Sequence, residues 1–185
     1  MDSTAVPYEE FAEVALSYLN QLYSASRRLS ASPADADDLV QDTYHLAFQH
    51  YRELRSLAHC RPWLYRILHR QAATRYRRDR SGPQLVLVDG GADDGDFAPP
   101  EVPLGEDALE RISLQEIRRI IDSLPSDLRV AVTLCDIEGF TYAEIADITD
   151  TPVGTVRSRI ARARAKLMNK LRTHAEECGI RRQTP

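Results

Sequence analysis

A run of arginines over residues 157–164 carries the side chains of this chain that are best suited to a chemical task. Arg157, Arg159 and Arg162 lie close together in this run, with Ser158 among them. An arginine can donate two parallel hydrogen bonds to a guanine edge or bind a phosphate oxygen, and a serine hydroxyl can bond either. These residue types at this spacing predict a surface that binds nucleic acid, although spacing does not decide which side chain reads bases.

A helix-turn-helix would place these side chains in a groove of DNA. Thr141 and Glu144 have the spacing of a capping box and predict a short helix over about 141–149. Thr151 and Pro152 suit the cap and the first position of a second helix. A short helix, a tight turn and a longer basic helix are the parts of a helix-turn-helix, which lays the N-terminal part of its second helix in the major groove.

The second helix of this unit, expected to run to about Glu177, is amphipathic. Its apolar seam comprises Val153, Val156, Ile160, Ala163, Leu167 and Leu171. The candidate DNA contacts that lie off this seam, at about 100° per residue, are Thr155, Arg157, Ser158, Arg159 and Arg162. The turn has Asp150 where many such turns have glycine, and aspartate tolerates the left-handed conformation better than most residues. The alternative is a basic amphipathic helix that pairs with acidic residues of the linker over 83–106 or of a partner.

Helical spacing also dominates the first 80 residues. A first helix is predicted over 8–29, and Ser32, Pro33 and Asp35 signal the start of a second. One face of this second helix has a core stripe at Val40, Tyr44, Ala47, Tyr51 and Leu54. The opposite side, facing water or a partner, has Asp38, Gln41, Asp42 and His45. A third helix from Pro62 to about Arg80 would bury Trp63, Leu64, Ile67 and Leu68.

The predicted fold class is all-α, with two small helical domains joined by a flexible acidic linker. Residues 81–110 contain eight acidic residues and no lysine or arginine, and the part up to about Gly105 has too little hydrophobicity to fold alone. Further helices are expected over about 107–123 and 126–138. The predicted divisions are a first domain over 1–82, the linker over 83–106, a second domain over 107–178 and a tail over 179–185.

Charge is segregated along the chain although the net charge is only −4. Between Arg61 and Arg80 there are seven basic residues and one acidic residue. Between Pro152 and Thr173 there are seven basic residues and no acidic residue. Two cationic surfaces joined by an anionic segment predict two contacts with a polyanion. An arginine-rich genome combined with a disordered acidic loop is the alternative explanation.

Composition and motifs exclude several other classes of protein. No apolar run of the 185 residues approaches the roughly 20 needed to span a bilayer, and the N-terminus lacks the features of a signal peptide. Three dispersed cysteines favour a reducing cytoplasm. We find no phosphate-binding, dinucleotide-binding, zinc-protease or nucleophile-elbow motif, and expect no cofactor. His174 with Cys178, and His59 with Cys60, lack the clustered spacing of a structural zinc site, so no metal is expected.

Residues 141–167 (TYAEIADITDTPVGTVRSRIARARAKL), preceded by LPSDLRVAVTLCDIEGF, resemble region 4 of the extracytoplasmic-function sigma factors. The earlier segments ADADDLVQDTYHLAF and RPWLYRILHRQAATRYRRDR resemble region 2 of the same family. The resemblance implies a non-enzymatic alternative sigma factor that binds core RNA polymerase and promoter DNA. It further implies contacts with the β′ clamp helices and the β flap, and an anti-sigma factor as an expected partner.

The resemblance also carries roles to particular positions. The polymerase-binding surface would comprise Asp38, Gln41 and Asp42. Residues that recognise and open the minus-10 element would include His59, Arg61, Arg66, Arg70, Arg75, Arg77 and Arg78. Four rings are available to hold an unstacked base, those of His59, Trp63, Tyr65 and Tyr76, of which Trp63 is expected to belong to the core instead. Residues at the minus-35 element would include Arg129, Tyr142, Thr155, Arg157, Ser158, Arg159 and Arg162. Arg70 replaces the asparagine of many family members, and Ala161 is small where some relatives have a larger contact residue.

Two rival functions remain open on the sequence alone. A stand-alone helix-turn-helix regulator would bind a duplex operator tightly without polymerase and would need a dimerising segment, of which the sequence shows no clear example. An interaction protein that sequesters a partner would use its arginines as protein contacts and would show no sequence preference on DNA.

Overall fold

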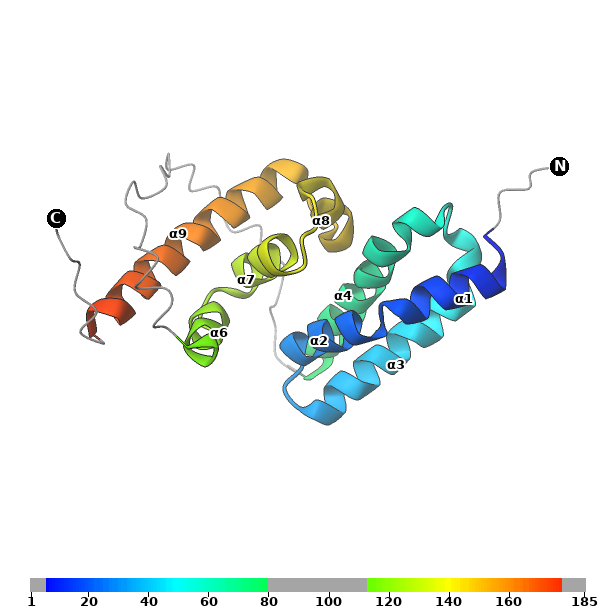
Figure 1. The fold of residues 1–185 in the computed structure, drawn as a ribbon, viewed down its shortest axis with the longest axis horizontal. Coiled ribbons are helices and arrows are strands. Elements are labelled where there is room, and N and C mark those ends of the chain that lie inside the picture. The colour runs from blue at the N-terminus through cyan, green and yellow to red at the C-terminus, as the bar shows by residue number, and fades with distance from the viewer. Residues whose placement is uncertain (1–5, 80–112, 178–185) are drawn as a thin grey trace. The chain divides into compact units, whose positions relative to one another are not determined.

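The computed structural model describes residues 6–79 and 113–177, which are helical and contain no strand (Figure 1). This confirms the all-α class. Contacts divide the chain into two compact units, Met1–Val86 with Ala146–Thr151 and Leu87–Ile145 with Pro152–Pro185. The predicted linker over 83–106 and the tail over 179–185 lie outside the described residues, so the predicted domain boundaries stay predictions.

The N-terminal helices are α1 (Tyr8–Ser17), α2 (Leu19–Leu29), α3 (Pro33–His50) and α4 (Cys60–Asp79), with 3₁₀ turns at Tyr51–Glu53 and Leu57–His59. The prediction of one helix over 8–29 is wrong. Tyr18 leaves the helical region at ψ 3°, and its N–H donates to the Ala15 oxygen, three residues back. This tight bond ends α1. No glycine or proline near Tyr18 signals the break.

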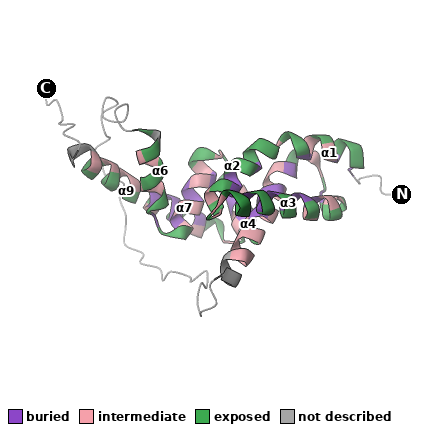
Figure 2. Ribbon diagram, turned by 90° about the horizontal axis from the view of Figure 1, so that it is seen from below, coloured by how far each residue is buried: buried purple, intermediate pink, exposed green. Residues whose placement is uncertain are grey.

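The core of the N-terminal helices forms where α3 packs against α2 and α4. Phe11, Leu22, Leu39, Leu64 and Leu68 are buried there. Figure 2 shows the buried stretches of these helices in purple. The predicted stripe is confirmed at four positions, since Val40, Tyr44, Ala47 and Leu54 are buried and Tyr51 is half-buried. However, α3 ends at His50, so Tyr51 and Leu54 lie beyond it.

Aromatic side chains close one end of this core. The Phe11 ring lies 5.3 Å from Phe48, 5.5 Å from Tyr51 and 6.0 Å from Trp63, measured between ring centroids. The Tyr44 hydroxyl donates to the Ala15 oxygen at 2.8 Å. The half-buried Trp63 therefore serves the core, as the sequence predicted.

The C-terminal helices are α6 (Leu114–Asp122), α7 (Ser126–Val132), α8 (Tyr142–Thr149) and α9 (Val153–Glu177). Ser113 and Glu116 form a capping box, so α6 begins at Leu114, and residues 107–112 of the predicted helix lie outside the described residues. The helix predicted over 126–138 also differs, because α7 ends at Val132 and a π-helical segment, η3, follows over Thr133–Ile137.

The core of the C-terminal helices lies along the seam of α9. Leu124, Leu128 and Val132 are buried with Ala163, and Leu167 packs against them. Val156 and Ile160 are also buried, but Val153 is exposed, so the predicted seam begins at Val156. Burial of this seam fixes which side chains of α9 can face a partner.

The turn between α8 and α9 has the predicted conformation. Asp150 adopts the left-handed region, with φ 55°, and the Thr151 N–H donates to the Ala146 oxygen at 3.1 Å. Thr141 and Glu144 form the predicted capping box, because the Thr141 hydroxyl donates to the Glu144 carboxylate at 2.8 Å and accepts from the Glu144 N–H at 3.3 Å. Local sequence signals thus set the start of α8 and the tight turn before α9.

Removing the Thr141 cap should destabilise α8. We expect Thr141→Ala to lower the free energy of unfolding by about 1 kcal/mol, because the Glu144 N–H loses its acceptor. Thr173→Ala, which removes an exposed hydroxyl from the interior of α9, is the matched control and should change stability by less than about 0.5 kcal/mol. Urea unfolding followed by circular dichroism measures both values, and equal effects would contradict the assigned cap.

Candidate nucleic-acid interface

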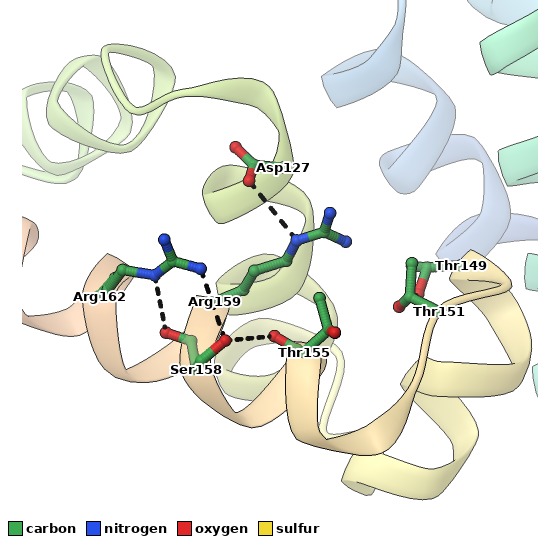
Figure 3. Close-up of polar contacts among 7 residues, drawn as sticks. All are labelled: Asp127, Thr149, Thr151, Thr155, Ser158, Arg159 and Arg162. Carbon is green, nitrogen blue, oxygen red and sulfur yellow. Dashed lines mark hydrogen bonds and ion pairs between the residues drawn. The ribbon is translucent and has the colours of Figure 1, made fainter. Parts of the chain in front are cut away.

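The N-terminal half of α9 presents a polar surface (Figure 3). Arg157 and Ser158 are exposed, whereas Thr155 and Arg162 are half-buried. The Ser158 hydroxyl donates to the Thr155 oxygen at 3.0 Å, and Arg162 Nε donates to the Ser158 oxygen at 3.4 Å. The Arg162 bond is long for its type, so little holds this guanidinium against its own helix.

Arg157 is the most available cation of this surface. Within the described part of the chain its side chain forms neither a hydrogen bond nor an ion pair, and the residue is exposed to solvent. An arginine that has no partner to release can form a bidentate contact at little cost. Arg157 therefore fits the predicted role in DNA contact.

Arg159 is placed differently from the other candidates. Its residue is only 9% exposed, and its Nε lies 3.5 Å from Asp127 Oδ2 of α7 (Figure 3). The sequence placed Arg159 off the apolar seam and did not predict a partner for it. The structure thus separates Arg159 from Arg157 and Ser158, which face outward.

A second ion pair joins α9 to η3, the π-helical segment that follows α7. Arg164 donates through Nε and Nη2 to the Asp136 carboxylate, with Nε 3.1 Å from Oδ2. These hydrogen bonds lower the pKa of Asp136 and raise that of Arg164. Arg164 belongs to the basic run of the sequence, but its charge is already paired within the fold.

Acid should weaken this part of the fold. The pKa of Asp136 is lower in the folded chain than its ordinary 3.8, so the pair contributes its full stability above that pH and loses it as pH falls through the folded value. We expect the thermal midpoint of Asp136→Asn to fall less than that of the original chain between about pH 6 and about pH 3. Asp147→Asn, at an exposed position of α8, is the control. Equal slopes for all three proteins would contradict this role for the pair.

Two further minus-35 candidates lie on α7 and α8. Arg129 is half-buried, and its Nη1 donates to the Asp122 oxygen at 2.8 Å, at the end of α6. Tyr142 is half-buried at the first position of α8. Arg129 thus also braces the connection between α6 and α7.

The predicted polymerase-binding surface lies on α3. Asp38, Gln41 and Asp42 are all exposed, as the sequence predicted from their position opposite the core stripe. Asp42 also forms an ion pair with Arg75 Nη2 of α4, and Arg75 Nη1 donates to the Asp35 oxygen at 3.2 Å. Asp38 and Gln41 are therefore the clearer candidates for a partner, since Asp42 already helps to join α3 to α4.

The predicted minus-10 cations are distributed over α4 and the 3₁₀ turn before it. His59 and Arg70 are exposed, and Arg61 donates to Gln21 Oε1 at 2.9 Å while it lies over the Tyr65 ring. Arg66 is half-buried, and its Nε has no hydrogen-bond partner among the described residues. Arg77 and Arg78 lie in the last turn of α4, and their side chains fall outside the described residues.

Tyr65 corrects one expectation about the aromatic residues. The sequence offered its ring as available to an unstacked base, but Tyr65 is 2% exposed and packs within the core. The Tyr76 side chain lies outside the described residues. His59 is therefore the one exposed ring of the four proposed that the structure describes.

The structure shows no metal site within residues 6–79 and 113–177, where no three acidic, histidine or cysteine side chains gather. His174 Nε2 lies 3.2 Å from Glu116 Oε1, whereas Cys178 is outside these ranges.

Burial raises the pKa of the Cys60 thiol to about 11 and that of Cys135 above its ordinary value, so both thiols stay protonated at neutral pH. No described helix has the length and apolar character to span a bilayer.

Known proteins share both helical units and their order. Family models match for sigma-70 region 2 over residues 14–82 and for sigma-70 region 4 over residues 114–167. The ECF RNA polymerase sigma factor SigE of Mycolicibacterium smegmatis is 33% identical over 182 residues, which are 95% of this chain and 66% of that protein. The ECF RNA polymerase sigma-E factor of Haemophilus influenzae is 36% identical over 145 residues, which are 74% and 75% of the two chains.

A solved structure has the same fold. The sigma factor RpoE of Bartonella quintana, crystallised with the anti-sigma factor NepR, superimposes with a TM-score of 0.65 at 26% identity, over 89% of this chain and 98% of that chain. The matches cover both units of the chain in the order that the sequence predicted. The chain therefore belongs to the extracytoplasmic-function sigma factors of the sigma-70 family, which act in transcription initiation.

Proposed function

We propose that the chain is an alternative sigma factor that binds core RNA polymerase and directs it to promoters through two separate DNA contacts. The observation that carries this proposal is the outward face of α9, where Arg157 and Ser158 are exposed beside Arg162. The N-terminal part of such a helix enters the major groove. There an arginine can donate two hydrogen bonds to guanine, and a serine hydroxyl can form a hydrogen bond with a base edge or a phosphate.

The minus-35 contact uses α9 for sequence and its neighbours for position. Arg157, Ser158 and Arg162 are the candidate base contacts, because they face outward in the first turns. Arg129, Tyr142 and Thr155 lie on three different helices and are suited to phosphate contacts that fix the register of α9 on the duplex.

The minus-10 contact uses α4 and the turn before it. The candidate cations are Arg61, Arg66, Arg70, Arg75, Arg77 and Arg78, with His59 as an exposed ring. Opening a duplex needs neutralised phosphates and a surface that holds an unstacked base, and cations beside an aromatic ring provide both. The chain itself supplies no catalytic group in this scheme, and polymerase performs the chemistry.

Protein partners are expected at the exposed face of α3 and at the region-4 unit. Asp38 and Gln41, with Asp42, form an acidic face suited to basic residues of the β′ clamp helices, and the region-4 unit is expected at the β flap. An anti-sigma factor in the cytoplasm is the expected inhibitor, since the Bartonella quintana relative was crystallised with one. The predicted acidic linker would lie between the two DNA-binding units.

Reconstitution with purified core polymerase tests this function. We expect the chain to support promoter-dependent initiation from the DNA upstream of its own gene or from another genomic fragment. Core polymerase alone should give no such initiation. A stand-alone regulator would instead bind a duplex tightly without polymerase. Absence of initiation on every genomic fragment, with a chain that binds DNA alone, would favour that rival.

A further inference from the structure

We propose that Asp127 is a positioning residue for DNA specificity, because it keeps the Arg159 guanidinium away from DNA phosphates. This inference rests on the proposed function of α9 as the minus-35 reader. It distinguishes Arg157 and Arg162, which are proposed to contact DNA, from Arg159, whose charge is retained inside the fold.

Contacts of the two side chains support this role. Arg159 is a charged residue with only 9% of its surface exposed, and Asp127 of α7 lies against it, with 3.5 Å between Nε and Oδ2. Arginine is almost never this buried unless it is paired. Figure 3 shows the Arg159 side chain directed to Asp127, whereas Arg162 lies along its own helix beside Ser158.

A second pair braces the other flank of α9. At about 100° per residue, Arg159 and Arg164 are separated by roughly 140° around the helix. Asp127 of α7, the helix that packs on the buried seam, binds the first, and Asp136 of η3 binds the second. The two pairs therefore limit rotation of α9 from both sides of that seam, and leave Arg157, Ser158 and Arg162 in the arc between them that faces outward.

Sequence preference depends on which cations of the protein do not contact DNA as well as on which cations do. A cation on a phosphate strengthens binding to every sequence, whereas a base contact strengthens binding to the correct one. If Asp127 loses its charge, Arg159 becomes an unpaired charge in a poorly solvated position, which favours its movement outward toward phosphate. On a random duplex no base contact fixes α9, so the helix can shift until Arg159 reaches a phosphate, and non-specific binding should rise more than specific binding.

The salt dependence of DNA binding tests the inference. The full chain, assembled with core polymerase, is titrated with a duplex selected from genomic fragments and with a random duplex of equal length. Asp127→Asn should steepen the slope of log affinity against log salt by about 0.9 on the random duplex, as expected for one additional phosphate contact, and by less on the selected duplex, where base contacts already fix α9. Between about 50 and 200 mM salt, this gives an extra loss of affinity of about 3- to 4-fold and a lower ratio of selected to random binding.

Four further variants isolate the role of Arg159. Arg159→Ala alone should leave the salt slope unchanged, and the double variant Asp127→Asn with Arg159→Ala should lose the added slope. Asp122→Asn makes the same change of charge at an exposed residue of α6 and should keep the original slope. Asp127→Glu should keep the original specificity, because it retains the carboxylate.

Two results would overturn the inference. The first is a slope that falls by about one in Arg159→Ala, since Arg159 would then already contact a phosphate. The second is an unchanged slope in Asp127→Asn while circular dichroism shows a native fold. If the original holoenzyme does not distinguish the selected duplex from the random one, the proposed function fails, and this inference fails with it.

Discussion

Arg157→Ala should weaken recognition of the minus-35 element by about 1–3 kcal/mol, or roughly 5- to 150-fold in affinity. Arg157 is exposed at the start of α9 and has no partner among the described residues, so its truncation removes a DNA contact without breaking one inside the fold. The loss should appear on the preferred minus-35 sequence and shrink when that sequence is scrambled, because a base contact acts only on the matching base.

Arg172→Ala is the matched control for this prediction. Arg172 is also an exposed arginine of α9, but lies near the C-terminal end, and its Nη2 reaches only Asn169 of its own helix at 3.5 Å. Run-off transcription from paired templates measures the dependence on each promoter sequence. An equal loss in both variants would indicate a general charge effect, and unchanged promoter selection in Arg157→Ala would remove Arg157 from the site.

Asp38→Lys should weaken binding of the chain to core polymerase by about 10-fold or more, which corresponds to about 1.4 kcal/mol. Asp38 is exposed on α3 opposite the buried stripe, so reversal of its charge leaves the packing of this helix intact. A like charge placed against the basic partner surface costs binding energy and slows association. Fluorescence anisotropy with a labelled chain, at about 0.1 M salt and at higher salt, measures the change.

Glu13→Lys makes the same change of charge on α1 and controls for the net charge of the chain. Asp42 is a poorer test, because Asp42→Lys would also break the ion pair with Arg75 and loosen the packing of α3 on α4. Equal affinities of Asp38→Lys and of the original chain for core polymerase would refute the proposed docking surface.

Local signals explain why much of this fold could be predicted from the sequence. The capping boxes at Ser32 and Thr141, together with the left-handed Asp150, are encoded within four residues of the positions they control. Apolar periodicity then identified the buried stripes of α3 and α9 and placed Asp38 and Gln41 outward. Both kinds of signal depend on near neighbours along the chain.

The sequence was least informative where contacts distant in sequence decide the surroundings of a side chain. Arg159 is withdrawn from the surface by Asp127, which is more than 30 residues away, and Arg164 is paired with Asp136 in the same way. Tyr65 is buried in the core although α4 is rich in arginine, and Arg61, which lies over its ring, also binds Gln21 of α2. A helical wheel shows the direction of a side chain but not the acidic partner that meets it.

The pairing pattern also changes how the basic runs should be counted. The sequence shows seven cations between Pro152 and Thr173, but Arg159 and Arg164 are neutralised within the fold. Arg75 is likewise shared with Asp42 in the N-terminal helices. The charge available to DNA is therefore smaller and more localised than the composition indicates, which favours sequence preference over general attraction to a polyanion.

A footprint of the assembled holoenzyme on its selected promoter shows whether the chain contacts DNA at two places while it is bound to polymerase. We expect two protected regions, one at the minus-35 element that Arg157→Ala weakens alone, and one at the minus-10 element where permanganate detects unpaired thymines. We also expect both regions to disappear when core polymerase is omitted. A single protected region without unpaired thymines, or the same protection by the chain alone, would contradict the proposed function.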